Sequence, residues 1–221
     1  MKIVEPYAEI LNMPDPGFIL KHIERAARTC YKSEDKITDG SALKLLKALN
    51  KSGHHSVFEH ISVSVRIVCD RGITHEIVRH RLCSFSQEST RYANYSKDKF
   101  GNEITVIRPF FWKNDSQEYK EWHRLMEEAE KSYLNLLEIG ATPQEARSVL
   151  PNSLKTEIIV TANLREWKHI FRLRCHKASH PQIRQIMLPL LNEFRKILPV
   201  YYNDLFELYI NDIEFFSQFG S

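Results

Sequence analysis

The sequence SVSVRIVCDRGITHEIVRHRLCSFSQESTRY, residues 62–92, sets most of the predicted architecture. Residues 62–68 alternate polar and apolar side chains, which is the pattern of a strand with one buried face. Residues 70–72, Asp-Arg-Gly, interrupt this pattern. Residues 73–82 then carry apolar side chains at a spacing near 3.6, which predicts a short helix. The segment that follows, residues 79–92, is therefore anchored by regular secondary structure, as ligand-binding loops commonly are.

This segment also concentrates fixed positive charge. It contains three arginines, one histidine and four serine or threonine hydroxyls, against a single acid, Glu88, and no lysine. Because a guanidinium is planar and binds phosphate or carboxylate oxygens two at a time, we predict that the segment binds an anion. Arg147, Arg165 and Arg174 lie on later segments and are further candidates. The alternative for each arginine is a solvated helix face.

The pattern of the rest of the chain predicts helices around a few strands. This composition indicates the α+β class, and we expect one domain, residues 1–221. The N-terminal segment, residues 2–10, is a predicted strand, and Asp15 with Pro16 begins a helix. A helix over residues 41–51 is expected to turn Leu43, Leu46 and Leu49 inward. The remaining predicted elements are strands at 103–108 and 156–162 and helices at 115–139, 143–150, 163–174, from 181 with a kink at Pro189, and 201–209.

Composition narrows the classes of protein. The chain has 43% hydrophobic residues and a net charge of +3, which is too small to indicate a nucleic-acid-binding protein by itself. Its four cysteines lie far apart without a Cys-x-x-Cys pair, which argues against a zinc ribbon and fits free thiols in a reducing compartment. The sequence shows neither a signal peptide nor an apolar stretch approaching 18 residues. We therefore expect a soluble, cytoplasmic protein without a membrane segment.

The motifs of several common enzyme classes are missing from the sequence. Five histidines lie between residues 54 and 80, but none forms His-Glu-x-x-His, and His75 and His80 do not share a helix face, so no metal site is expected. There is no Gly-x-Ser-x-Gly elbow, and we assign Ser84, Ser86 and Ser89 to phosphate binding rather than nucleophilic attack. None of the seven glycines forms Gly-x-Gly or a P-loop. A phosphate must then be held by side chains and helix N-termini.

A second class remains open, a module that binds RNA. In that interpretation residues 79–92 bind phosphates, and Tyr92 and Tyr95 stack on bases. Binding of RNA by the purified protein is the outcome that favours this class.

The order of the motifs resembles the flavin-dependent thymidylate synthase family. The family signature is Arg-His-Arg, seven residues, then Ser, which here is Arg79-His80-Arg81 followed by Ser89. Arg91-Tyr92 matches as well. Further matches occur in the family's order over roughly residues 53–185, and they are Gly53-His54, Ser56, Glu59-His60, Arg147 before Leu150-Pro151, Asn163 with Arg165, and Leu173-Arg174.

The resemblance implies a fold and an activity. The implied fold has a central, mainly antiparallel sheet flanked by long helices. The implied enzyme is a homotetramer with active sites shared between subunits and with FAD as cofactor. It makes dTMP from dUMP, with 5,10-methylenetetrahydrofolate as carbon donor and NADPH as reductant, and it binds neither nucleic acid nor membrane.

The resemblance also implies site residues, with Arg174 as the catalytic group that stabilises negative charge developing on the uracil ring. Ser89 is assigned to substrate binding, because its motif contains no base to deprotonate it. The implied FAD-binding residues are Ser56, Arg79, His80, Arg81, Gln87, Asn163, Arg165 and His169. The implied dUMP-binding residues are Glu76, Arg79, Gln87, Ser89, Arg91, Arg147 and Arg174.

Overall fold

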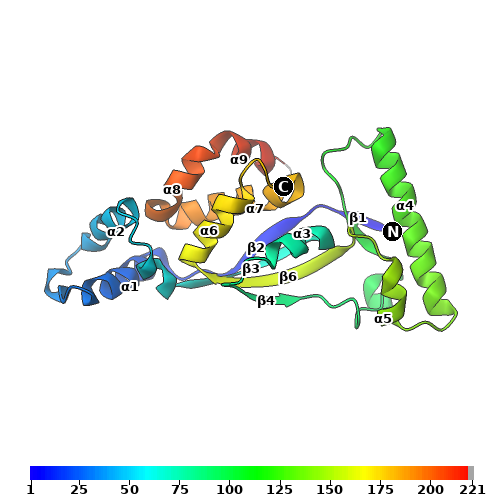
Figure 1. The fold of residues 1–221 in the computed structure, drawn as a ribbon, viewed down its shortest axis with the longest axis horizontal. Helices are drawn as coiled ribbons and strands as arrows, with labels where there is room; N and C mark the ends of the chain where they lie inside the picture. Colours follow the sequence, from blue (N-terminus) through cyan, green and yellow to red (C-terminus); the bar gives the residue numbers. More distant parts are fainter. Residues whose placement is uncertain (219–221) are drawn as a thin grey trace. The chain divides into compact units, whose positions relative to one another are not determined.

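The computed structural model describes residues 1–218, except for the side chain of Lys99 (Figure 1). The chain forms two compact units. Unit 1 consists of Met1–Tyr7, Ile67–Arg79 and Phe85–Ile158, and unit 2 consists of Ala8–Arg66, His80–Ser84 and the residues from Ile159 onward. The assignment of the whole chain to one domain stays a prediction.

A four-stranded sheet has the order β2-β3-β6-β4, with β2 at Tyr7–Asn12, β3 at Ser62–Asp70, β6 at Lys155–Asn163 and β4 at Ser84–Gln87. The predicted alternation is present, since Val63, Val65 and Ile67 of β3 are fully buried. A separate pair, β1 (Lys2–Val4) and β5 (Thr105–Ile107), is parallel. Helices combined with an antiparallel sheet confirm the α+β class.

The prediction of one strand over residues 2–10 was wrong, because the segment divides into β1 and β2. Pro6 lies between them and cannot donate a backbone hydrogen bond to a neighbouring strand. The helix predicted over residues 73–82 was also too long. Helix α3 covers Arg71–Ile77 and ends where its apolar stripe ends, and Leu82 is 75% exposed.

Unit 1 has a core beneath its long helix α4 (Gln117–Glu138), which begins at the N-cap Ser116 and ends before Gly140. Trp122, Met126 and Tyr133 of α4 are buried in this core. The capping box between Thr142 and Glu145 begins α5 (Pro143–Ala146), and a 3-10 turn, η4, follows at Arg147–Val149. Another short 3-10 turn, η3, lies at Asp98–Phe100.

Unit 2 has a helical core rich in aromatic side chains. Helix α6 (Leu164–Arg174) is held in place by two hydrogen bonds, because Trp167 Nε1 donates to the carbonyl of Val63 in β3 at 3.0 Å and Tyr202 Oη donates to that of Leu164 at 2.9 Å. The helices of this unit are α1 (Pro16–Thr29), α2 (Ser41–Lys51), α6 (Leu164–Arg174), α7 (Pro181–Ile197), α8 (Pro199–Leu208) and α9 (Ile210–Ser217), with 3-10 turns η1 (Glu34–Lys36) and η2 (Ser56–His60).

One detail of the predicted helices differs in unit 2. Leu43 of α2 is 52% exposed, because the buried stripe of this helix runs through Ala42 and Leu46 instead. Helix α7 continues through Pro189, and the kink expected there stays a prediction. Among the described residues, no helix combines the length and the apolar character that crossing a membrane requires.

Candidate active site

Helix α6 presents a basic face at the end of β6. Asn163 caps the helix, and its Oδ1 accepts a hydrogen bond from the backbone N–H of Glu166 at 2.8 Å. Trp167 and Phe171 turn into the core of unit 2, whereas Arg165, His169 and Arg172 are exposed. Their spacing of four and then three residues places these three basic side chains along one side of the helix.

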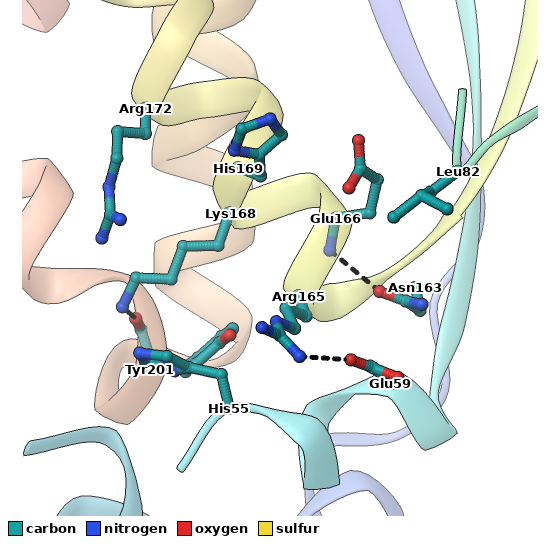
Figure 2. A pocket seen from close by; sticks show the side chains of 10 residues that line it. All are labelled: His55, Glu59, Leu82, Asn163, Arg165, Glu166, Lys168, His169, Arg172 and Tyr201. Carbon is teal, nitrogen blue, oxygen red and sulfur yellow. Dashed lines mark hydrogen bonds and ion pairs between the residues drawn. The ribbon is translucent and has the colours of Figure 1, made fainter. Parts of the chain in front are cut away.

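A cavity of about 600 Å³ lies within unit 2, beside this face (Figure 2). Helix α6, the turn that contains Glu59 and the start of α8 contribute to its wall. The residues that line it are His55, Glu59, Leu82, Asn163, Arg165, Glu166, Lys168, His169, Arg172 and Tyr201.

Two of the cations in this wall are already paired. Arg165 Nη1 lies 2.5 Å from Glu59 Oε1, and both side chains are about half exposed, at 52% and 45%. Lys168 is buried, and its Nζ lies 2.6 Å from the carbonyl oxygen of Tyr201 and 2.9 Å from Asp204 Oδ2. Burial lowers the pKa of Lys168, although Asp204 acts in the opposite direction. With these partners Lys168 holds α6 to α8 and is a structural cation.

Two polar atoms at the cavity are buried without a hydrogen-bond partner among the described residues. They are Nδ1 of His55 and the hydroxyl oxygen of Tyr201. Burial raises the pKa of Tyr201, and it lowers the pKa of His55 together with the charges of Lys168 and Arg165. Both groups are therefore neutral at pH 7. Because buried polar groups are almost always satisfied, these two atoms indicate that a hydrogen-bonding group, from a ligand or from water, occupies the cavity beside them.

His80 contacts residues at both ends of α6. Arg174 Nε donates to His80 Nε2 at 2.9 Å, and His80 Nδ1 lies 3.5 Å from Glu166 Oε1. The ring of His80 also meets that of His169 edge-on, with centroids 5.9 Å apart. Burial, Arg174 and His169 lower the pKa of His80 to about 4. His80 is thus a neutral imidazole at pH 7, and only 5% of it is exposed.

The same cluster has the composition of a metal site, since ligand atoms of His80, Glu166 and His169 lie within 4.8 Å of one another. The hydrogen bond from Arg174 argues against a metal here. Because Nε2 accepts that bond, the single proton of neutral His80 is on Nδ1, the nitrogen nearest Glu166. A bound cation would have to displace this proton beside a permanent guanidinium charge.

The predicted substrate residues of unit 1 lie on and after β4. Gln87 Nε2 donates to the hydroxyls of Thr74 at 3.0 Å and Thr156 at 3.3 Å. The hydroxyl of Ser89 accepts from the backbone N–H of Arg91 at 3.3 Å. These bonds fix the amide plane of Gln87 and the turn that follows it.

Arg147 binds the segment of residues 87–91, because its Nη1 donates to the hydroxyl of Thr90 at 3.4 Å. Glu88 is held by Lys155 Nζ at 3.2 Å and by the hydroxyl of Tyr95 at 3.1 Å. Tyr95 is buried, so the expectation that it stacks on bases was wrong, whereas Tyr92 is exposed.

The predicted site residues fall into both units. In unit 2, Asn163, Arg165 and His169 line the cavity, His80 and Arg174 contact each other, and Ser56 and Arg81 are exposed away from the cavity wall. In unit 1, Gln87, Ser89, Arg91 and Arg147 lie on one segment or bind it, Arg79 is exposed and Glu76 is partly exposed. The cavity residues that sequence reasoning missed are His55, Glu59, Leu82, Glu166, Lys168, Arg172 and Tyr201.

Comparison with known proteins gives one consistent family. The family model described as thymidylate synthase complementing protein matches residues 18–200. A flavin-dependent thymidylate synthase of Pyrococcus furiosus is 35% identical over 166 residues, which are 75% of this chain and 67% of the relative. One of Geobacter sulfurreducens is 31% identical over 204 residues, which are 89% of this chain and 85% of the relative.

A solved structure agrees on the fold. It is the UMP/dUMP methylase PolB from Streptomyces cacaoi bound with 5-Br dUMP, with a TM-score of 0.75, 24% identity, and coverage of 92% of this chain and 96% of that one. At this identity the likeness establishes the fold. The sequence matches establish more, because they extend over most of the chain. The protein therefore belongs to the flavin-dependent thymidylate synthase family.

Proposed function

We propose that this protein converts dUMP to dTMP by reductive methylation, with FAD as bound cofactor, 5,10-methylenetetrahydrofolate as carbon donor and NADPH as reductant. Family membership over residues 18–200 carries the proposal. The basic cavity of unit 2 and the fixed segment of residues 87–91 supply the groups that an anionic cofactor and a nucleotide need. We further propose that the enzyme is one domain, a cytoplasmic homotetramer with active sites shared between subunits.

The cavity of unit 2 fits a large, polar anion such as FAD. Arg165, His169 and Arg172 place positive or proton-donating groups at its wall, and His55 and Tyr201 add two unsatisfied neutral atoms. When bound, FAD supplies the hydride-transfer chemistry, and the chain binds and orients it. Family resemblance assigns six further residues to FAD binding, and they are Ser56, Arg79, His80, Arg81, Gln87 and Asn163.

For dUMP, guanidiniums and hydroxyls on and near β4 are the proposed ligands. Arg91 and Arg147 suit a phosphate, and Ser89 adds a hydroxyl. The amide nitrogen of Gln87 donates hydrogen bonds to two threonine hydroxyls. Its carbonyl oxygen is therefore the atom that can accept a hydrogen bond from a substrate N–H. The remaining proposed dUMP residues are Glu76, Arg79 and Arg174.

Arg174 is the proposed catalytic residue. Negative charge that develops on the uracil ring during reduction needs a donor that carries charge at every relevant pH, and a guanidinium meets this requirement. Removing a comparable charge-stabilising donor from an active site costs about 3–4 kcal/mol in the barrier. The loss is expected in kcat rather than in FAD binding.

The absorption spectrum of the purified protein tests the cofactor assignment. We expect a yellow protein, or a colourless one that becomes yellow when FAD is added, with the flavin retained through gel filtration. A folded protein that stays colourless after FAD addition and binds RNA instead would overturn the proposal in favour of the RNA-binding class.

A further inference from the structure

We propose that His80 and Glu166 are positioning residues that orient Arg174, with Glu166 fixing the proton of His80 and His80 fixing the guanidinium. The proposal rests on the catalytic role given to Arg174 above. It also changes the role of His80, which family resemblance assigns to FAD binding. All three residues lie in unit 2.

The first step is the bond between Arg174 and His80. Arg174 has a permanent charge and donates its Nε–H to His80 Nε2 at 2.9 Å. Nε lies on the stem side of the guanidinium, so this bond restrains the plane of the group at its base. Arg174 is the last residue of α6, where the helix itself restrains a side chain least. His80 supplies the restraint that the helix end lacks.

The second step is the tautomer of His80. A neutral imidazole has one N–H, and Nε2 can accept from Arg174 only when the proton is on Nδ1. Nδ1 lies 3.5 Å from Glu166 Oε1, and a carboxylate at this position favours a proton on that nitrogen. Glu166 is itself held in the first turn of α6, where its backbone N–H bonds Asn163. The three residues thus connect the start of α6 to its end.

The groups around His80 favour this neutral, oriented state. Arg174, His169 and Glu166 face it from α6, and Cys83 comes from its own loop. Burial and then Glu166 raise the pKa of Cys83 to about 12, so its thiol stays protonated. Burial also raises the pKa of Glu166, whereas His169 and Arg165 lower it. Burial and the permanent charge of Arg174 together keep the His80 ring unprotonated.

Histidine-ring nitrogen NMR on the FAD-loaded protein tests the tautomer without using activity. With all ring nitrogens labelled as ¹⁵N, the His80 signals are identified by their loss in His80→Phe. We expect a protonated Nδ1 and an unprotonated, hydrogen-bonded Nε2 in the wild type. In Glu166→Ala we expect proton density to move toward Nε2. A wild-type His80 protonated on Nε2 would overturn the proposal even if the variants fail to fold.

Kinetics at saturating dUMP test the consequence for the reaction. We expect Glu166→Ala and His80→Phe to keep FAD and to lose about 10- to 100-fold in kcat, as misplaced catalytic groups do, with a smaller change in KM. His80→Gln provides an acceptor oxygen near the position of Nε2, and it should recover most of the loss. Glu193→Gln, which removes an exposed carboxylate paired with Lys196 on α7, is the matched control with wild-type turnover.

The outcomes separate this proposal from the proposed function. If His80→Phe loses FAD in parallel with activity, His80 binds the cofactor directly and the positioning role is wrong. If Arg174→Ala abolishes turnover but His80→Phe and Glu166→Ala do not change kcat, the positioning role is again wrong while the proposed reaction stands. If Arg174→Ala turns over normally, the catalytic role of Arg174 fails, and the NMR result still reports on the tautomer.

Discussion

Glu59 forms an ion pair with Arg165, a residue that is proposed to bind the anionic cofactor FAD. The two side chains are 2.5 Å apart at their nearest atoms and about half exposed. A ligand phosphate that binds Arg165 must compete with Glu59 for the same guanidinium. Removing the carboxylate in Glu59→Gln is therefore expected to strengthen binding of FAD.

The expected magnitude is small, because solvent screens half-exposed charges. Exposed ion pairs contribute about 0.2–1 kcal/mol, so the gain in FAD affinity should not exceed roughly fivefold. It should shrink further as salt is raised, since screening weakens the competition. Arg165→Gln removes the cation instead and should weaken FAD binding, which makes it the paired control.

Titration of the apo-protein with FAD, followed by quenching of flavin fluorescence at low and high salt, measures both variants. Tighter binding in Glu59→Gln at low salt, with the difference reduced at high salt, supports the competition. Weaker binding in Glu59→Gln would refute it, because Glu59 would then be an acceptor for a ligand donor rather than a competitor for Arg165.

Three further predictions concern Tyr201, His80 and Ser89. Tyr201→Phe removes an unsatisfied buried hydroxyl, so it should raise the thermal stability of the apo-protein, by up to about 1–3 kcal/mol, and weaken FAD binding. The pKa of His80 is lowered to about 4 in the folded protein, so the unfolded chain takes up a proton on this ring first as the pH falls. The free energy of unfolding should therefore fall between pH 6.5 and 4 by on the order of 2–3 kcal/mol. In His80→Gln the fall should be smaller when unfolding is measured across this range. Ser89→Ala should weaken dUMP binding and leave residual dTMP formation, whereas complete loss at saturating dUMP would indicate a nucleophile.

Much of the fold could be predicted because local patterns decide it. The alternation of residues 62–68 predicted β3, and the caps at Asp15, Ser116 and Asn163 satisfy helix N-termini through side chains that the sequence displays. Pro6 is the counterexample, since one missing N–H divided a predicted strand. The end of α3 was also missed, because helical spacing gave no boundary once the buried stripe stopped at Ile77.

The candidate site could be predicted only in part, because contacts distant in sequence decide it. Arg165 and His169 were identified by resemblance, and their helical spacing could have added Arg172. The pairing of His80 with Arg174 joins residues from separate segments, and neither periodicity nor composition reports it. The buried polar atoms of His55 and Tyr201 could not be told from ordinary core groups, since only the packed structure shows that they have no hydrogen-bond partner among the described residues.

Conversion of dUMP by the purified protein tests the central claim most directly. The FAD-loaded protein is incubated with dUMP, 5,10-methylenetetrahydrofolate and NADPH, and the nucleotide products are identified by mass spectrometry, with each component omitted in turn. We expect dTMP only in the complete mixture, and almost none from Arg174→Ala that has retained its FAD. A folded, FAD-loaded protein that forms no dTMP in the complete mixture would contradict the account.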